Sequence, residues 1–181
     1  MTPMKEDYLK IIFELGGNRK KVTNKDISLG LGIAAGSVTE MISKMASEGL
    51  VNHEPYAGIS LTDKGLKYAA ELVRKHRLWE TFLVDKLQYN SADVHAEAEV
   101  LEHNTSDRLA TALDSFLGHP RYCPHGGVIP SASGEFTDAS HRVLADGKDG
   151  EHVELLRFLD NHDLLTYLNE CGLTPHESVT I

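Results

Sequence analysis

The 181-residue sequence has only two cysteines and lacks any long apolar run. Because its apolar stretches extend over a few residues at most, we expect no membrane-spanning helix. Cys123 and Cys171 are too few for a disulfide scaffold, which favours a cytoplasmic location. The first ten residues, MTPMKEDYLK, lack the apolar segment of a secretory signal. From these absences we expect a globular cytoplasmic protein with one large domain or two small ones.

Acidic residues outnumber basic ones, and the net charge is −9. The excess is uneven: residues 1–75 hold 11 Lys or Arg and 9 Asp or Glu, whereas residues 76–181 hold 7 and 18. Nine of the ten histidines lie in the second part. The first part could therefore approach nucleic acid, while the second is rich in oxygen and nitrogen donors. This asymmetry indicates two separate tasks.

The first part has the pattern of three helices followed by a hairpin. DYLKIIFELG shows helical spacing, Thr23 is a typical N-cap for the next helix, and Gly49 is a good stop for the third. Ser37 and Glu40 form a capping-box pattern at the start of that third helix. The β-prone runs LVNH and ISLT flank the turn EPYAG. The order predicts a winged helix-turn-helix over residues 1–72.

The third helix would be the recognition helix that reads DNA. Small polar residues at its start can reach base edges, and a lysine one turn later can reach phosphate. The alternative is that these residues only decorate an exposed helix. The candidate DNA contacts are Ser37, Thr39, Glu40 and Lys44, with Tyr56 at the tip of the hairpin.

The second part begins with an all-helical region. We expect a long amphipathic helix opened by Thr62, a second helix capped at Ser91, and a third capped at Thr105 or Ser106 and stopped by Gly118. This third helix has an apolar face that two copies of the chain could share, formed by Leu109, Leu113, Phe116 and Leu117.

A Pro/Gly-rich connector, HPRYCPHGGVIPSASGEFTD, follows these helices. The remaining residues contain the β-prone runs HVELLRFL and LLTYLN, and are too few to bury a core alone. We therefore expect a mainly α protein with a helical domain at 73–138 and a β-containing segment at 139–181.

The stretch HAEAEVLEH concentrates metal-binding side chains on one side of a helix. At about 100° per residue, His95, Glu99, Glu102 and His103 fall within an arc of roughly 100°, while Glu97 points the other way. Such a stripe is most often plain solvated surface. Here it lies in a region with excess negative charge, where a divalent cation would relieve the repulsion among the acids.

Two further motifs carry the same donors. HRLWE places His76 and Glu80 at i, i+4, and YCPHGG adds Cys123 and His125 in a constrained loop. A lone cysteine is often only a small buried residue, so Cys123 has both interpretations. Oxygen-rich sites with imidazoles suit Mn²⁺ or Fe²⁺ better than structural Zn²⁺, which prefers several thiolates. Imidazole must be neutral to bind metal, so occupancy should fall as pH drops.

With these motifs placed, the sequence resembles the diphtheria-toxin-repressor family of metal-dependent regulators, in its manganese-responsive branch. The match covers about residues 4–130, and SVTEMISKMASEGLV…LTDKG followed by H…E…HAEAEVLEH is highly specific. The resemblance implies a homodimer that represses metal-uptake genes by binding a palindromic double-stranded operator when loaded with Mn(II), or with Fe(II) as the alternative. A cation joining the N-terminal helix to the dimerisation helices would hold the two winged helices for operator binding.

The resemblance also implies two ligand sets. One consists of Asp7, Glu99, Glu102 and His103, with His76 as a neighbour. The other draws on Glu80, on His76 or His95, and on the connector residues Cys123 and His125, joined by an acid for which Asp160 is the candidate.

Two features of the sequence depart from the family pattern. Lys10-Ile11 stands where some manganese regulators carry a carboxylate used in a two-ion cluster, and residues 139–181 resemble only the first half of an SH3-like domain.

Two other classes of function remain open at this point. A metalloenzyme could use the His/Glu clusters to activate water, although no nucleophile or general-base motif is present. A metal-independent winged-helix regulator could sense a small apolar ligand, in which case the donors would be plain surface.

Overall fold

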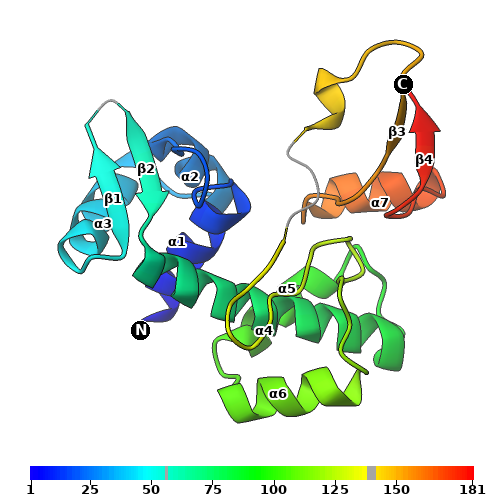
Figure 1. Ribbon diagram of the computed structural model, residues 1–181, viewed down its shortest axis with the longest axis horizontal. Coiled ribbons are helices and arrows are strands. Elements are labelled where there is room, and N and C mark those ends of the chain that lie inside the picture. Colours follow the sequence, from blue (N-terminus) through cyan, green and yellow to red (C-terminus); the bar gives the residue numbers. More distant parts are fainter. Residues whose placement is uncertain (56, 138–141) are drawn as a thin grey trace. The chain divides into compact units, whose positions relative to one another are not determined.

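The computed structural model describes residues 1–55, 57–137 and 142–181, and divides the chain into two compact units, Met1–Val73 and Arg74–Ile181. Helices make up most of the regular structure in both units (Figure 1). Across the described ranges, none of the helices combines the length and apolarity that crossing a bilayer requires. The predicted DNA contact Tyr56 and the predicted boundary at residue 138 lie outside the described residues. The prediction of a mainly α protein is confirmed.

The first unit contains three helices and a two-stranded hairpin in the predicted order. The strands pair antiparallel, with Val51 opposite Leu61 and Glu54 opposite Gly58. In this unit α1 packs on α2 and on β2, and α3 packs on α2 and β1. The elements are α1 (Pro3–Glu14), α2 (Asn24–Leu31), α3 (Ala35–Ser47), β1 (Val51–Glu54) and β2 (Gly58–Leu61).

The inner face of α3 forms the centre of the first unit's core. Val38, Ile42 and Met45 recur at helical spacing and are completely buried. Their burial leaves the opposite face of α3 exposed to solvent. A recognition helix needs this arrangement, since one face holds it in the unit and the other is available to a partner.

The local signals at the helix ends are partly as predicted. Thr23 caps α2 in a reciprocal capping box with Asp26, and Gly49 adopts a φ of 69° just after α3. The predicted capping box of Ser37 and Glu40 is wrong, because α3 already begins at Ala35 and its N-cap, Ala34, makes no side-chain cap bond.

The second unit consists of helices followed by a small C-terminal sheet. Helix α4 (Asp63–Leu87) begins in the first unit, and Thr62 caps its start by accepting a hydrogen bond from the Gly65 amide at 3.0 Å. The other elements are α5 (Val94–Glu102), α6 (Asp107–Phe116), a 3-10 turn (Leu144–Asp146), β3 (His152–Glu154), α7 (His162–Glu170) and β4 (Ser178–Thr180).

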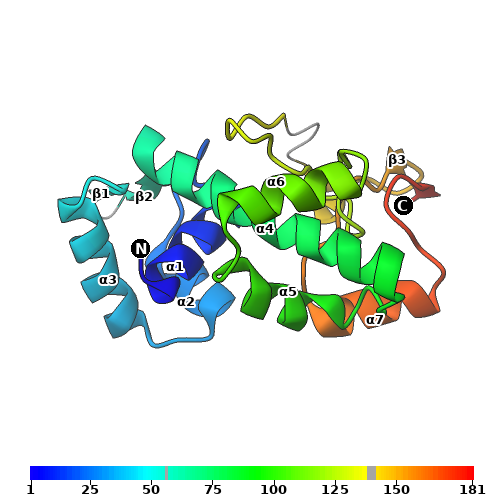
Figure 2. The same ribbon diagram turned by 90° about the horizontal axis from the view of Figure 1, so that it is seen from below.

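Helices α4 and α6 lie side by side and share a core with the connector (Figure 2). The indole nitrogen of Trp79 donates to Thr105 Oγ1 at 2.7 Å, which ties α4 to the residues just before α6. Ser106 caps α6 by accepting from the Leu109 amide, as one of the two predicted caps. The buried cluster consists of Leu78, Ala110, Leu113, Cys123 and Ile129.

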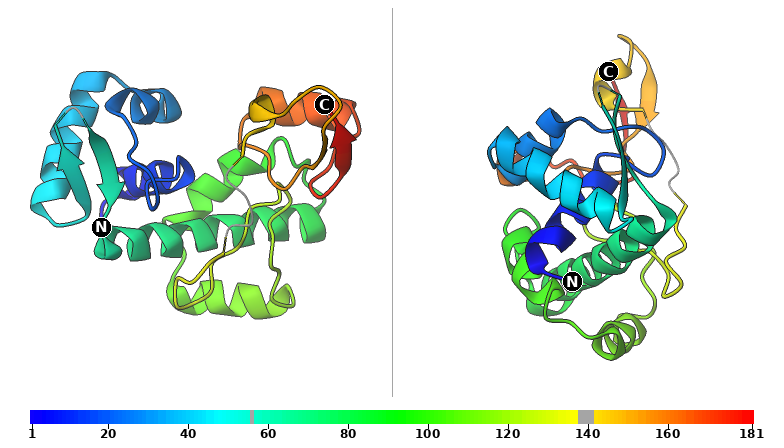
Figure 3. Two further views of the ribbon diagram at one scale, coloured as in Figure 1. Left: turned by 45° about the horizontal axis from the view of Figure 1, so that its top comes forward. Right: turned by 90° about the vertical axis from the view of Figure 1, so that its left-hand side faces the viewer.

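The C-terminal segment differs from its prediction. The run LLTYLN lies in α7 rather than in a strand, because Asn161 caps this helix through the Leu164 amide and the helix buries Leu165. Figure 3 shows α7 beside the short β3–β4 ladder, in which Val153 pairs with Val179. The SH3-like character of this segment stays a prediction.

The same segment is anchored on the turn before α5. The side-chain amide of Asn169 donates to Ser91 Oγ at 3.2 Å, and a ring nitrogen of His162 lies 3.1 Å from the Ala92 carbonyl oxygen. Ser91 was predicted to cap α5, but the N-cap is Asp93, without a side-chain cap bond. Ser91 instead helps to hold the C-terminal segment in place.

Candidate metal centre

Helix α4 contributes two buried donors to the second unit. Because His76 and Glu80 are four residues apart, they lie on one face, with 3.1 Å between His76 Nε2 and Glu80 Oε1. His76 is 3% exposed and Glu80 is fully buried. A carboxylate in such a position needs positive charge or hydrogen-bond donors around it.

The connector loop brings two more donors to Glu80. A hydrogen bond from the Cys123 amide to the Gly127 carbonyl, 2.9 Å long, closes a tight turn. Nε2 of His125 lies 2.7 Å from the Ser91 carbonyl oxygen, to which it donates. This bond directs the other ring nitrogen, Nδ1, to within 3.1 Å of Glu80 Oε1.

Asp160 completes the group from the C-terminal segment. The Phe158 amide donates to the His125 carbonyl at 2.9 Å and thereby places the following residues against the loop. Asp160 Oδ1 lies 2.7 Å from His125 Nδ1, and Asp160 Oδ2 lies 3.6 Å from His95 Nδ1. We refer to these residues as the donor cluster, which consists of His76, Glu80, His95, Cys123, His125 and Asp160.

The geometry of the donor cluster suits a cation. Its ligand atoms form two overlapping groups, each within 4.8 Å, that share Glu80. Although Glu80 is buried, its Oε2 atom has no hydrogen-bond partner among the described residues. A buried carboxylate with one unsatisfied oxygen, grouped with nitrogen, oxygen and sulfur ligand atoms, is an arrangement that suits a divalent metal ion. The residues present therefore fit a metal.

The electrostatics of Glu80 support the same interpretation. Burial by itself would raise the pKa of the Glu80 carboxyl group. The positive charge of His76 and hydrogen bonds from His125, His76 and His95 outweigh burial and hold this pKa well below its usual value. Glu80 is thus a carboxylate at neutral pH, ready to bind a cation.

The two connector donors hold protons when no cation is present. Burial and the nearby charge of Glu80 raise the pKa of the Cys123 thiol. Burial lowers the pKa of His125, but hydrogen bonds with Asp160, Cys123 and Glu80 raise it far above its usual value. A metal ion that binds both side chains must displace these protons.

The predicted stripe on α5 is split between two surroundings. Glu99 is half exposed and lies 3.4 Å from His95, measured from Oε1 to Nε2. Glu102 is 1% exposed, with its Oε2 atom 2.5 Å from His76 Nδ1 and its Oε1 atom 3.5 Å from His103 Nε2. Glu102 therefore has one oxygen toward the donor cluster and the other toward His103.

Sequence reasoning missed Arg77, which supports the connector loop. Its guanidinium donates to the Val128 carbonyl at 2.5 Å and packs against Gly127, where a Cβ atom would lie 2.9 Å from the Arg77 Cζ atom. The same position would be 3.3 Å from the sulfur of Cys123. The only signal in the sequence was an arginine on the apolar side of an amphipathic helix.

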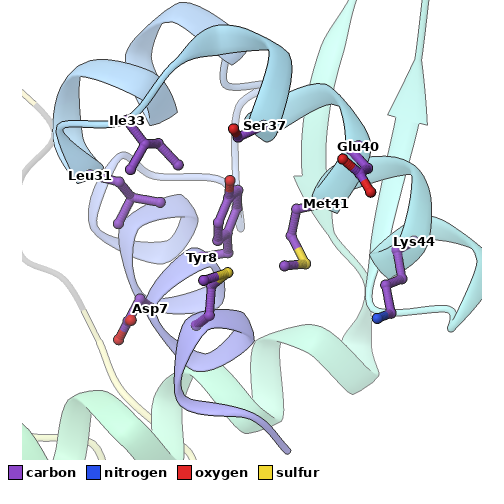
Figure 4. A pocket seen from close by; sticks show the side chains of 9 residues that line it. Asp7, Tyr8, Leu31, Ile33, Ser37, Glu40, Met41 and Lys44 are labelled. Carbon is purple, nitrogen blue, oxygen red and sulfur yellow. The ribbon is translucent and has the colours of Figure 1, made fainter.

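In the first unit, the DNA-contact candidates of α3 are exposed. Thr39 accepts a hydrogen bond from the Asn24 side chain at 2.9 Å. A pocket of about 710 Å³ lies beside the helix, with Asp7 and Tyr8 from α1 in its lining (Figure 4). The α3 residues that line it are Ser37, Glu40, Met41 and Lys44.

A helix-turn-helix with a hairpin, followed by helices with buried His and Glu donors and a connector with buried Cys and His donors, defines the class of metal-responsive DNA-binding regulators. Residues 1–59 match the model of the iron dependent repressor, N-terminal DNA binding domain. Residues 62–131 match the iron dependent repressor, metal binding and dimerisation domain.

Relatives and solved structures agree with these matches. The iron-dependent repressor IdeR of Mycobacterium tuberculosis is 30% identical, with 97% of this chain and 82% of that protein covered. The structure of the metal-dependent regulator MtsR is 41% identical and covers 100% and 84%, with a TM-score of 0.88. A manganese-dependent transcriptional repressor in complex with manganese is 38% identical and covers 97% and 81%, with a TM-score of 0.86.

The chain belongs to the iron-dependent repressor family. It is a transcriptional repressor rather than an enzyme, it binds a divalent metal, and its two domains indicate a homodimer that binds DNA. These findings exclude the metalloenzyme and the metal-independent regulator considered from the sequence. A 52% match to a probable metal transport system membrane protein of Chlamydia trachomatis spans only 71 residues and 16% of that protein.

Proposed function

We propose that this chain is a manganese-responsive repressor of metal-uptake genes, which binds a palindromic operator as a homodimer when its donor sites hold Mn²⁺. Fe²⁺ is the alternative corepressor. The observation that carries the proposal is the buried Glu80 carboxylate, which has an unsatisfied oxygen and faces His125 and Asp160. Such a group is costly without a cation and favourable with one.

Glu80, Cys123, His125 and Asp160 would hold one cation, with His76 and His95 beside it. When bound, the cation supplies the positive charge that allows these carboxylates to converge. His125 is oriented for this role by Ser91, and Cys123 by the turn that ends at Gly127. Holding the donors in advance reduces the free-energy cost of assembling the site.

The second ligand set follows from the family resemblance. Glu99 and Glu102 on α5 and His103 at its C-cap, together with Asp7 on α1, would hold another cation. Because Asp7 belongs to the DNA-binding domain and the others to the dimerisation domain, shared ligation would restrict the separations available to the two recognition helices of a dimer. These helices need to be about 34 Å apart, or a multiple of that, to enter successive major grooves.

The donor chemistry favours Mn²⁺ or Fe²⁺. Carboxylates and imidazoles dominate both ligand sets, and Cys123 is the only sulfur among them. The similar structures include that of the manganese regulator SloR and that of ScaR with bound Zn²⁺. The single thiolate would also admit softer ions in vitro, so metal availability as well as affinity would decide the ion in the cell.

The test is DNA binding as a function of metal. A DNA duplex selected from a random library by the Mn²⁺-loaded protein would be titrated with wild-type protein in Mn²⁺, Fe²⁺, Zn²⁺ or chelator, and fluorescence anisotropy measured. We expect Mn²⁺ to raise the affinity by up to about 150-fold, the upper range of typical allosteric coupling. Equal affinity with Mn²⁺ and with chelator would contradict the proposal.

Variants connect this effect to the proposed ligands. Glu80→Ala and Glu102→Ala should bind the duplex weakly in Mn²⁺, as wild type does in chelator. The matched control is Glu97→Ala, because Glu97 is an exposed residue of the same helix as Glu102. Full metal response in Glu80→Ala and Glu102→Ala would refute the assigned ligands.

A further inference from the structure

We propose that His76 couples the two cation sites, so that filling the site of Glu102 and His103 strengthens binding at the site of Cys123 and His125. This inference rests on the proposed function and adds a positioning residue that links its two sites.

The contacts of His76 carry the argument. Its Nδ1 atom lies 2.5 Å from Glu102 Oε2, and its Nε2 atom lies 3.1 Å from Glu80 Oε1. All three side chains are at most 4% exposed. One imidazole thus joins a carboxylate of each proposed site, without intervening solvent.

Each carboxylate also faces its own set of donors. Glu102 Oε1 lies 3.5 Å from His103 Nε2, and Glu80 Oε1 lies 3.1 Å from His125 Nδ1. The sequence of contacts therefore runs from His103 through Glu102, His76 and Glu80 to His125. Every step is between side chains of the second unit, which lie on α4, on α5 and its C-cap, and on the connector.

The sign of the coupling follows from the restriction of side-chain rotamers. Ligation orients the Glu102 carboxylate, and its hydrogen bond orients the His76 ring, which in turn orients Glu80. A second ion then meets donors whose rotamers are already restricted, so less conformational entropy is lost on binding. We therefore expect positive coupling between the sites.

The measurement requires a signal from one site only. Co²⁺ bound to a thiolate gives a charge-transfer absorption, and in a Cys171→Ser background Cys123 is the remaining thiol. Titration of the full-length apo protein with Co²⁺ would give the affinity of the Cys123 site. The comparison uses this background alone, with His103→Ala, with His76→Gln, and with both substitutions.

We expect His103→Ala to weaken Co²⁺ binding at the Cys123 site about tenfold when His76 is present, within the usual range of allosteric coupling. In the His76→Gln background the same substitution should change it less than about twofold. In each background the Co²⁺ affinity with His103 is divided by the affinity with Ala at that position. Any affinity that His76 itself contributes is present in both values and cancels from this ratio. Glu97→Ala is the control for a neutral change on α5.

Two results would overturn the coupling. One is an equal effect of His103→Ala with and without His76, and the other is no effect with His76 present. If the ligand set of the proposed function is wrong at Cys123, the unsubstituted background will show no charge-transfer band, and failure of the function itself shows separately as equal DNA affinity in Mn²⁺ and in chelator. Circular dichroism would establish that each variant is folded.

Should His76→Gln fail to fold, a second readout uses the native imidazole. In Cys123→Ser protein labelled with ¹⁵N-histidine, Cd²⁺ would be added to fill the remaining site. We expect the ring-nitrogen resonances of His76 to shift upon this addition. Unchanged His76 resonances while those of His103 move would contradict the coupling.

Discussion

Oε1 of Glu80 lies 3.1 Å from Nδ1 of His125, and the two side chains are 0% and 3% exposed. Glu80 comes from the C-terminal half of the long helix α4, and His125 from the connector 45 positions later in the sequence. Because both side chains are buried, the negative charge that Glu80 presents to a cation lies away from solvent.

The first prediction concerns the effect of the Glu80 charge on Mn²⁺ affinity. Glu80→Gln keeps the size of the side chain but loses the negative charge that faces His76, His125 and Asp160. We expect the Mn²⁺ affinity of this site to fall by at least about 100-fold. Loss of a residue that only hydrogen-bonds a metal ligand lowers affinity by at most about this factor. Isothermal titration calorimetry would measure it, with Glu97→Gln as the exposed control. An unchanged affinity would exclude Glu80 as a ligand.

A second prediction concerns the backbone next to His125. Gly126 has a φ of 80°, and a Cβ atom there would lie 2.1 Å from the Leu156 carbonyl oxygen. Gly126→Ala should therefore push the segment that carries Asp160 away from the loop. We expect weaker Mn²⁺ binding and a loss of about 3 kcal/mol in the free energy of unfolding.

Gly118 offers a matched comparison for this prediction. Its φ is 77°, but nothing lies within 4 Å of its Cβ position. Gly118→Ala should lower the free energy of unfolding by only about 1 kcal/mol, because alanine disfavours a left-handed backbone, and should leave the Mn²⁺ affinity unchanged. Urea denaturation and calorimetry would measure both quantities. Equal losses of Mn²⁺ affinity and of unfolding free energy in Gly126→Ala and Gly118→Ala would show that the contact with Leu156 does not support the site.

Protons should leave the donor cluster when metal enters it. The raised pKa values of His125 and Cys123 keep both protonated in the apo protein at pH 7. Because metal binds only their deprotonated forms, its affinity should increase as pH rises and decrease as pH falls. We expect about two protons released per ion in wild type and about one in Cys123→Ser. Calorimetry in buffers of different ionisation enthalpy would count them, and the absence of release would contradict this ligand assignment.

On α3, Lys44 is exposed and would contact a DNA phosphate. Lys44→Gln should weaken DNA binding similarly for all sequences. It should also reduce the slope of log affinity against log salt by about 0.9 per subunit contact. Anisotropy titrations over a range of salt concentrations would measure this, with the exposed Lys148→Gln as the control. A salt slope equal to that of wild type would remove Lys44 from the interface.

Much of the helical framework could be predicted from the sequence. The amphipathic periodicity and local capping signals at Thr23, Thr62 and Ser106 act over a few residues, and each of these caps is present. The run LLTYLN was misassigned because β-propensity was weighed without the cap that Asn161 provides. Ser37 was misassigned because α3 starts without any side-chain cap.

The candidate site was predictable in its residue types but not in its assembly. The i, i+4 spacing of His76 and Glu80 already places them together on a helix. By contrast, the position of Asp160 depends on the backbone bond from Phe158 to His125, and the orientation of His125 depends on the Ser91 carbonyl. Such backbone groups are the same for every residue type, so the sequence carries no signal of them.

The most direct test is anomalous X-ray scattering from crystals of the full chain grown with Mn²⁺. We expect a manganese peak bonded to Glu80 and His125, with Cys123 and Asp160 as further ligands. A chain that binds its operator only in the presence of Mn²⁺, yet shows no manganese peak beside Glu80, would contradict the account.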